Sequence, residues 1–368
     1  MKAKIPAYGR IANISWTVAK SLKRGFVGIR DLIQKEAQID FREEVPVIKR
    51  LYFHLHGFAT SSGVLYDFER HSPAQYLSDF KMRRRKKANG NEQAFPTRKY
   101  PFHLLMERSH PDFLPELYGL IAGEEALSKE QNLINENAAN WLLETVENLG
   151  QVVVKPEDGN GGEGVVLLSW KDGAVDIAGD AASIDELVAK SMDETYMVVE
   201  HIEQAPYSAE IYPESVNTIR VITLWDYEAN KPYIADAIHR FGTNVSRPVD
   251  NWDSGGLSAG IDLESGELLQ ATRFPDSAAA KWFRTHPDTN IQIEGVTIPQ
   301  WDEITDTCCE MAETFWYVPM NAWDIVVSED GIKVIEGNSR PTIEMIQAHR
   351  PLFIDERNRQ FFEYHDAL

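Results

Sequence analysis

A glycine-rich loop between two apolar runs is the feature that most restricts the fold of this chain. The stretch from Gln151 to Trp170 is QVVVKPEDGNGGEGVVLLSW, with a G-x-G-x-x-G pattern at Gly159, Gly161 and Gly164. In a dinucleotide-binding Rossmann unit this pattern follows a strand and begins a helix, because the pyrophosphate rests on the helix N-terminus. Here the loop leads into VVLL, a β-branched apolar run that predicts another strand. The sequence therefore predicts a strand–loop–strand hairpin instead of a Rossmann motif.

Such a loop can fold over a polyphosphate and donate backbone N–H groups to it. Glycine permits the close approach and the positive φ angles that this requires. The candidates are Gly159, Gly161, Gly162 and Gly164, and Lys155 stands at the entrance of the loop, where an ammonium would neutralise phosphate charge. The alternative is an ordinary glycine-rich hairpin.

A second hairpin is predicted in WDIVVSEDGIKVIEGNSRP, residues 323–341. A three-residue turn at 329–331 pairs the strands in this register: Ser328 with Ile332, Val326 with Val334, and Asp324 with Glu336. Asn338 then shares a face with Glu336. Facing carboxylates repel each other, and a Mg²⁺ ion, which prefers one or two carboxylates plus phosphates, removes that conflict. The alternative is a solvated charged end of the hairpin.

Composition restricts the class of protein. The chain has 368 residues, of which 43% are apolar and 26% charged, as in ordinary globular proteins. No run approaches the roughly 18 apolar residues of a membrane span, and the N-terminus lacks the pattern of a signal peptide. Cys308 and Cys309 are adjacent and provide neither a disulfide framework nor a zinc site. We expect a cytoplasmic protein.

Charge is distributed unevenly along the chain. The net charge of −20 argues against nucleic-acid binding, which needs a basic surface. Residues 1–35, however, hold eight Lys/Arg and one Asp, and residues 81–87 read KMRRRKK. In the first segment Ile14, Val18, Leu22, Ile29 and Ile33 recur at roughly helical spacing, interspersed with lysines and arginines. One hypothesis is peripheral membrane association through this basic N-terminus. The other is a helix packed on its own domain with solvated lysines.

The coarse pattern of elements changes along the chain. Residues 1–95 look mainly helical, with one strand-like piece, LYFHLHG, at 51–57, and helical sequence continues from residue 98 to residue 149. Short β-runs follow, with a hairpin tip at 264–266 and a helix over 301–316 that makes Cys308 a packing residue. His54 and His56 could share a strand face as metal ligands, but no third ligand is near in sequence, which favours structural histidines.

The order of these motifs resembles the ATP-grasp superfamily. The VVVKP…GxGGxG hairpin, the VVEHI strand and the distal D…ExN set carry the resemblance from Arg98 to Gln347. Three segments are similar to the sugar-transfer-associated ATP-grasp family: SVNTIRVIT (215–223), VDNWDSGG (249–256) followed by GID, and IEGNSRPTIE (335–344). The resemblance implies an α+β fold in which two α+β subdomains, residues 96–205 and 206–368, clamp ATP between antiparallel sheets, with a mainly helical region at 1–95.

The resemblance also implies roles for individual residues. Lys99 and Lys155 would contact phosphates under the glycine loop, and Glu200, the backbone of His201 and Ile202, and Glu203 would bind the adenosine. Asp324, Glu336 and Asn338 would hold Mg²⁺. Arg220, Arg240 and Arg340 are candidates for binding substrate and stabilising the transition state. Many ATP-grasp ligases have an arginine two residues before the first metal-binding aspartate; Ala322 stands there in this chain, and Arg340 is the predicted substitute.

The implied function is an ADP-forming carboxylate–amine ligase that uses ATP and Mg²⁺. A small-molecule carboxylate, expected to be sugar-derived, would become an acyl phosphate and be attacked by an amine, in a pathway of polysaccharide or cell-surface glycan modification. Two alternatives stay open. One is an ATP-grasp phosphotransferase acting on a hydroxyl, and the other is a nucleotide-binding regulator without turnover.

Overall fold

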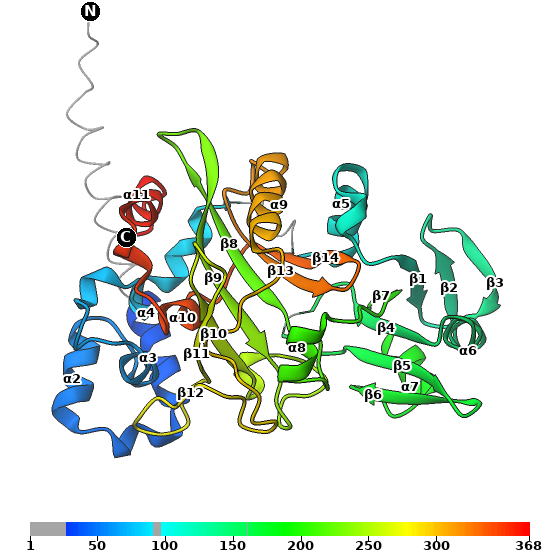
Figure 1. The fold of residues 1–368 in the computed structure, drawn as a ribbon, viewed down its shortest axis with the longest axis horizontal. Helices are drawn as coiled ribbons and strands as arrows, with labels where there is room; N and C mark the ends of the chain where they lie inside the picture. Colours follow the sequence, from blue (N-terminus) through cyan, green and yellow to red (C-terminus); the bar gives the residue numbers. More distant parts are fainter. Residues whose placement is uncertain (1–26, 91–96, 160) are drawn as a thin grey trace, which may run out of the picture.

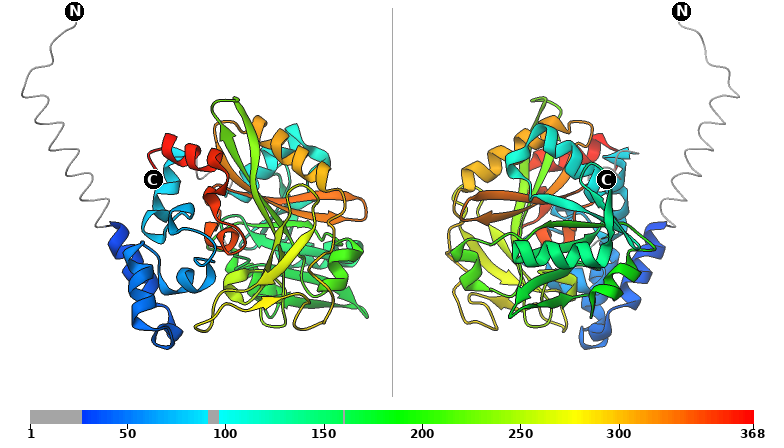
Figure 2. Two further views of the ribbon diagram at one scale, coloured as in Figure 1. Left: turned by 60° about the vertical axis from the view of Figure 1, so that its left-hand side comes forward. Right: turned by 90° about the vertical axis from the view of Figure 1, so that its right-hand side faces the viewer.

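The computed structural model describes residues 27–90, 97–159 and 161–368. These residues form two antiparallel seven-stranded sheets with helices around them, in agreement with the predicted α+β class. Figure 1 shows the second sheet in the middle of the molecule, the first sheet at one end and the helices of residues 27–90 at the other end. Figure 2 shows the same arrangement from two other sides. Lys20, Lys23, Arg24 and most of the predicted basic helix lie outside the described residues.

The first sheet is built from residues 117–200 and has the order β3-β2-β1-β7-β4-β5-β6. Its strands are β1 (Leu117–Ala122), β2 (Glu125–Ser128), β3 (Leu133–Asn137), β4 (Gln151–Pro156), β5 (Val166–Lys171), β6 (Ala174–Gly179) and β7 (Tyr196–Glu200). Helices α6 (Ala138–Leu149) and α7 (Ile184–Lys190) cover one face, where Leu142, Val146 and Leu187 pack against the buried valines of β4, β5 and β7. This leaves the other face of β4 and β7 toward the rest of the molecule.

The second sheet is built from residues 219–338 and has the order β12-β11-β10-β9-β8-β13-β14. Its strands are β8 (Ile219–Asp226), β9 (Lys231–Phe241), β10 (Leu257–Ile261), β11 (Leu268–Thr272), β12 (Trp282–Phe283), β13 (Met320–Ser328) and β14 (Gly331–Asn338). Helices α9 (Trp301–Thr314) and α5 (Lys99–Ser109) cover one face (Figure 1). The predicted helix at 301–316 and the hairpin tip at 264–266 are confirmed, and Cys308 is buried in this core.

The opposite face of the second sheet is divided between core and cleft. Ile222 and Leu224 of β8 pack against the helices of residues 27–90 and of the C-terminus. Arg220 has the same orientation, because side chains alternate along a strand, and it lies beyond the end of that core. The N-terminal helical region therefore borders the part of the sheet that carries the charged residues.

The N-terminal and C-terminal helices pack together on this face. Besides a helix at 27–37, the remaining helices are α2 (Val47–Leu55), α3 (Thr60–Leu65), α4 (Asp79–Met82), α8 (Pro206–Ile211), α10 (Ile343–Gln347) and α11 (Glu356–Tyr364). Short 3-10 helices are η1 (Asp40–Glu44), η2 (Pro73–Gln75), η3 (Arg83–Lys87), η5 (Pro111–Phe113), η6 (Trp252–Ser254) and η7 (Leu352–Ile354). Within the described ranges, none of these helices has the length and apolarity that crossing a bilayer would require.

Two sequence predictions are wrong in this part of the molecule. The piece LYFHLHG lies mostly in helix α2. Phe53 is the only buried side chain of α2, so this segment has no alternating buried face of the kind that a strand would need. His54 contacts Glu36 at 3.3 Å, as a structural histidine does. The segment predicted as helical from 98 to 149 contains strands β1 to β3, of which β2 and β3 are short and polar and give a weak period-two signal.

Candidate active site

A cleft of about 1190 Å³ lies between the two sheets. The first sheet contributes residues of β4, β5 and β7, and the second contributes residues of β8, β9, β13 and β14. The cleft is lined by these predicted site residues: Lys99, Lys155, Gly159, Gly161, Gly162, Glu200, Ile202, Glu203, Arg220, Arg240, Asp324, Glu336, Asn338 and Arg340. Gly164 is outside the lining, and its N–H donates to the Asp180 carboxylate at 2.6 Å.

The glycine loop joins β4 to β5, which pair as the predicted hairpin. Gly161 and Gly162 have φ angles of 68° and 80°, which favour glycine. A Cβ atom on Gly162 would lie 2.7 Å from Val249, and one on Gly161 would lie 3.0 Å from the amide of Asn251. The loop therefore spans the cleft and packs against a segment that leads into the second sheet.

Two buried lysines converge below the loop. The Lys99 ammonium donates to the carbonyl of Gly159 at 2.7 Å, and that of Lys155 lies 3.5 Å from the carbonyl of Ile335. Burial, together with the charge of Lys99, lowers the pKa of Lys155 to about 8, although Glu336 acts in the opposite direction. Two buried lysines in the same part of the cleft suit a polyanion.

The neighbouring part of the cleft is apolar. Val153, Leu167 and Val199 of the first sheet line it together with Ile202. Glu200 is fixed at the end of β7, because its carboxylate accepts the N–H of Glu116 at 2.9 Å. An apolar slot beside two buried lysines is suited to a base and a phosphate chain of one nucleotide.

The hairpin of β13 and β14 brings Asp324 opposite Glu336, as the sequence predicts. The predicted three-residue turn is wrong: Ser328 pairs with Gly331, and Ser328 Oγ donates to the Gly331 carbonyl at 2.8 Å. The other two predicted pairs are wrong for the same reason. A register shift between Asp324 and Ile325 inserts one extra residue, Ile335, and restores the Asp324–Glu336 pairing.

Two arginines hold Asp324 in place. Arg220 donates to both carboxylate oxygens at 2.7 Å, and Arg240 donates to Oδ2 at 2.8 Å. Burial alone would raise the pKa of Asp324, but the two guanidinium groups lower it to about 2. Enclosure in the cleft and the charge of Asp324 raise the pKa of Glu336 instead.

These residues fit a divalent cation. The carboxyl groups of Asp324 and Glu336 stand opposite each other on paired strands, and a cation between them would remove their mutual repulsion. Asn338 adds an amide oxygen, which accepts the N–H of Arg340 at 2.9 Å. Across the described ranges no three His, Cys, Asp or Glu side chains form a metal cluster. Two carboxylates and an amide leave room for phosphate oxygens and water, as Mg²⁺ prefers.

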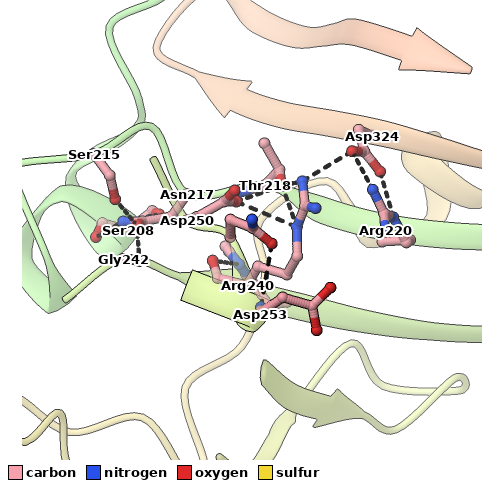
Figure 3. Close-up of polar contacts among 12 residues, drawn as sticks. Ser208, Ser215, Asn217, Thr218, Arg220, Arg240, Gly242, Asp250, Asp253 and Asp324 are labelled. Carbon is pink, nitrogen blue, oxygen red and sulfur yellow. Dashed lines mark hydrogen bonds and ion pairs between the residues drawn. The ribbon is translucent and has the colours of Figure 1, made fainter. Parts of the chain in front are cut away.

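A hydrogen-bonded network connects Arg240 to the loop that follows β9. The Thr218 backbone N–H and hydroxyl donate to Asp250 at 2.8 and 2.5 Å, and Arg240 Nε donates to Thr218 Oγ1 at 2.9 Å (Figure 3). Sequence reasoning missed Thr218 and Asp250 as site residues. Their signal was present, because both lie within motifs of the resemblance, SVNTIRVIT and VDNWDSGG.

Asn217 anchors the strand that carries this network. Its amide donates to the carbonyls of Ser208 and Tyr212 at 3.1 and 2.8 Å, and its Oδ1 accepts from Ser215 at 2.8 Å (Figure 3). The motif SVNTIRVIT therefore connects α8 to the start of β8 and holds in place the end of the strand that carries Arg220.

Two antiparallel sheets that enclose a cleft under a glycine loop, with buried lysines on one side and a carboxylate pair on the other, define the ATP-grasp fold. The chain belongs to the sugar-transfer-associated ATP-grasp family, whose sequence model matches residues 105–356. No curated protein sequence matches the chain.

The chain is similar in structure to several solved proteins. An ADP complex of N5-carboxyaminoimidazole ribonucleotide synthetase has 13% identity and a TM-score of 0.38, with 68% of this chain and 46% of that chain covered. D-alanyl-alanine synthetase A from Vibrio cholerae has 10% identity and a TM-score of 0.39, covering 74% and 66%. A β-γ-ATP complex of biotin carboxylase from Campylobacter jejuni has 12% identity and a TM-score of 0.43, covering 74% and 46%. The chain thus spans less than half of the first and third proteins.

Proposed function

We propose that the chain is an ATP- and Mg²⁺-dependent ligase that activates a carboxylate as an acyl phosphate for attack by an amine. The observation that carries this proposal is the cleft itself. Two buried lysines share the cleft with the paired residues Asp324 and Glu336, and an apolar slot adjoins them. Positive charge for phosphates, oxygen ligands for a metal and a site for a base meet in one space.

Each group has a role in binding ATP. The base lies in the slot formed by Val153, Leu167 and Val199, beside the backbone that follows Glu200. Lys99 and Lys155 neutralise the phosphates, and the glycine loop closes over them. A closed loop excludes water, which would otherwise hydrolyse an acyl phosphate.

Asp324, Glu336 and Asn338 would hold Mg²⁺, which supplies charge neutralisation for the phosphates when bound. Arg220 donates two N–H groups to Asp324, and its other N–H groups can donate to a phosphate or a substrate carboxylate. Arg240 and Arg340 line the same cleft and can add to this charge. The substrate carboxylate attacks the γ-phosphorus, ADP leaves, and an amine then displaces phosphate from the acyl carbon.

The family name supports a sugar-derived carboxylate, such as a uronic acid, in polysaccharide or cell-surface glycan modification. Peripheral membrane contact through the basic N-terminus belongs to the same proposal. It is supported by the eight basic residues before residue 36 and by Ile29 and Ile33, which are 53% and 62% exposed. Such a surface matches an anionic bilayer.

The test is Mg²⁺-dependent ATP consumption with a panel of uronic acids and amino acids in the presence of hydroxylamine. Hydroxylamine converts an acyl phosphate into a stable hydroxamate. ADP formed together with a hydroxamate supports the ligase and identifies its carboxylate. ADP with a phosphorylated acceptor and no hydroxamate would favour the phosphotransferase. Nucleotide binding without any turnover would favour a regulator.

A further inference from the structure

One acidic side chain in the cleft has no role in the chemistry described so far. Asp253 lies on η6, in the motif VDNWDSGG, and it lines the cleft. Figure 3 shows its carboxylate directed away from the Arg240 network, with no dashed line to either oxygen. Among the described residues, its backbone N–H has a hydrogen-bond partner but its carboxylate takes part in no hydrogen bond or ion pair.

The backbone of Asp253 is nevertheless held firmly. Its N–H donates to the side chain of Asn251 at 3.2 Å, and Trp252 beside it is buried. Asp250, at the start of the same turn, accepts from Thr218 and lies 3.4 Å from Arg240. Because Arg240 also donates to Asp324, one continuous network fixes Asp253 relative to the proposed metal ligands.

The charged groups around Asp253 come from three elements. These are Glu344 of α10, Lys35 of the helix at 27–37 and Arg220 of β8. Partial burial in the cleft and the charge of Glu344 raise the pKa of Asp253, and Lys35 and Arg220 oppose this. Lys35 is already bound to Asp79 at 2.6 Å, and Arg220 to Asp324 at 2.7 Å. Among the described residues, each of these cations is ion-paired with another carboxylate and neither forms an ion pair with Asp253.

An unpaired carboxylate at this place favours a positively charged group of a bound substrate over a negatively charged one. The cations nearby, Lys155, Arg220 and Arg240, serve the phosphates and the anionic substrate in this proposal, and the neighbouring carboxylates Asp250 and Asp324 are already ion-paired with arginines. Asp253 would repel a second anion and attract a cation. In the ligase reaction the substrate that carries positive charge is the amine.

We propose that Asp253 binds the ammonium group of the amine substrate and accepts a proton from it, a role that rests on the ligase function proposed above. An aliphatic amine with a pKa of about 8 to 10 is mostly protonated at neutral pH and then has no lone pair for attack. Asp253 takes the first proton. The nitrogen then forms the C–N bond, the C–O bond to phosphate breaks, and phosphate leaves with the electron pair. The second nitrogen proton leaves with the phosphate.

The test separates the two half-reactions in the full-length protein. Wild type, Asp253→Asn and Asp253→Glu are compared, with Asp306→Asn as a matched control on the exposed side of α9. Each is given ATP, Mg²⁺ and the carboxylate identified by hydroxamate formation. One reaction contains hydroxylamine, which is largely unprotonated at neutral pH and needs no base. The other contains the amino acid that wild type accepts, over pH 6.5 to 9.5.

Asp253→Asn is expected to form hydroxamate within about twofold of wild type. Its rate of amide formation at pH 7 should be roughly a hundredfold lower, within the usual contribution of a general base. The deficit should shrink as pH rises, because the amine then arrives unprotonated. Asp253→Glu should recover part of the rate, and Asp306→Asn should match wild type in both reactions.

Two results would overturn the role of Asp253 while leaving the ligase intact. One is amide formation by Asp253→Asn at the wild-type rate. The other is an equal loss of hydroxamate and amide at every pH, which would assign Asp253 to the carboxylate step or to folding. If wild type itself forms no hydroxamate with any carboxylate, the ligase proposal fails, and the role of Asp253 fails with it.

Discussion

Replacing Lys155 with methionine is expected to stabilise the protein at neutral pH while abolishing nucleotide binding. The Lys155 ammonium is buried, and the one hydrogen-bond acceptor it has among the described residues, the carbonyl of Ile335, is 3.5 Å away. Methionine has a similar volume and carries no charge, so the desolvation cost disappears. A stabilised variant without nucleotide binding would support the proposed role of Lys155 at the phosphates.

The magnitude follows from the pKa. A fall from the ordinary value of 10.5 to about 8 corresponds to a destabilisation of up to about 3 kcal/mol at 1.36 kcal/mol per pKa unit. Below pH 8 the lysine is protonated in both folded and unfolded states, and the destabilisation is complete. Between pH 8 and 10.5 the folded state loses the proton first, so the unfolded state binds more protons and wild-type stability rises with pH. The advantage of Lys155→Met should therefore shrink across that window.

Urea unfolding followed by tryptophan fluorescence measures this, because Trp141 and Trp170 report on the first sheet. Wild type, Lys155→Met and the control Lys171→Met are compared at pH 7 and pH 10. Lys171 is exposed on β5 and pairs with Asp176, so its loss should change stability by less than about 1 kcal/mol. A Lys155→Met protein that is no more stable than wild type at pH 7, or that keeps the same advantage at pH 10, would refute the reasoning. Magnesium and ADP should stabilise wild type and leave Lys155→Met unchanged.

Three further predictions concern the metal, the loop and the N-terminus. Glu336→Gln should raise the Mg²⁺ concentration needed for half-maximal turnover by more than about tenfold, since loss of a side chain that only supports a metal ligand already costs about that much affinity. An unchanged Mg²⁺ titration would contradict the ligand assignment. Gly162→Ala should raise the KM for ATP, while Gly173→Ala, with the same φ of 80° but no atom within 4 Å of the added Cβ, should lose stability alone; equal KM values would argue against loop closure. Reversing the charges of Lys20 and Lys23 should abolish sedimentation with anionic vesicles at low salt, and wild type that stays in the supernatant would refute membrane contact.

Sequence reasoning located the cleft because its residues follow local rules. The strand–loop–strand hairpin came from strand patterning and the glycine pattern, whereas the two antiparallel sheets were implied by the family resemblance. The pairing of Asp324 with Glu336 was predicted from the wrong turn and is restored by the register shift. The arginine partners of Asp324 could not be predicted in this way. Arg220 and Asp324 are 104 residues apart in the chain and meet only because β8 pairs with β13. A strand order with that adjacency cannot be deduced from the periodicity of either strand.

The wrong predictions have physical causes of the same kind. The turn of the β13–β14 hairpin is shorter by one residue than predicted, and a bulge at Ile335 compensates, so the pairing of Asp324 with Glu336 is kept while the intervening pairs shift. A bulge is set by tertiary contacts, here including the approach of Lys155 to the Ile335 carbonyl, and leaves little trace in local sequence. Helix α2 was mistaken for a strand because its apolar residues are mostly exposed and so do not mark a buried face.

The position two residues before Asp324 is Ala322, and its burial in the second sheet explains why no arginine stands there. Ala322 is fully buried, opposite Ile222 on one side and Asn338 on the other, in the core that joins the N-terminal helices to the second sheet. An arginine there would put a charge into that core. The neighbouring strands β8 and β9 deliver Arg220 and Arg240 to Asp324 instead, from within the cleft. Arg340, which is exposed at the rim, was the substitute inferred from sequence. Because Arg220 and Arg240 already touch the proposed metal ligand, we infer that they supply the missing charge and that Arg340 meets the substrate.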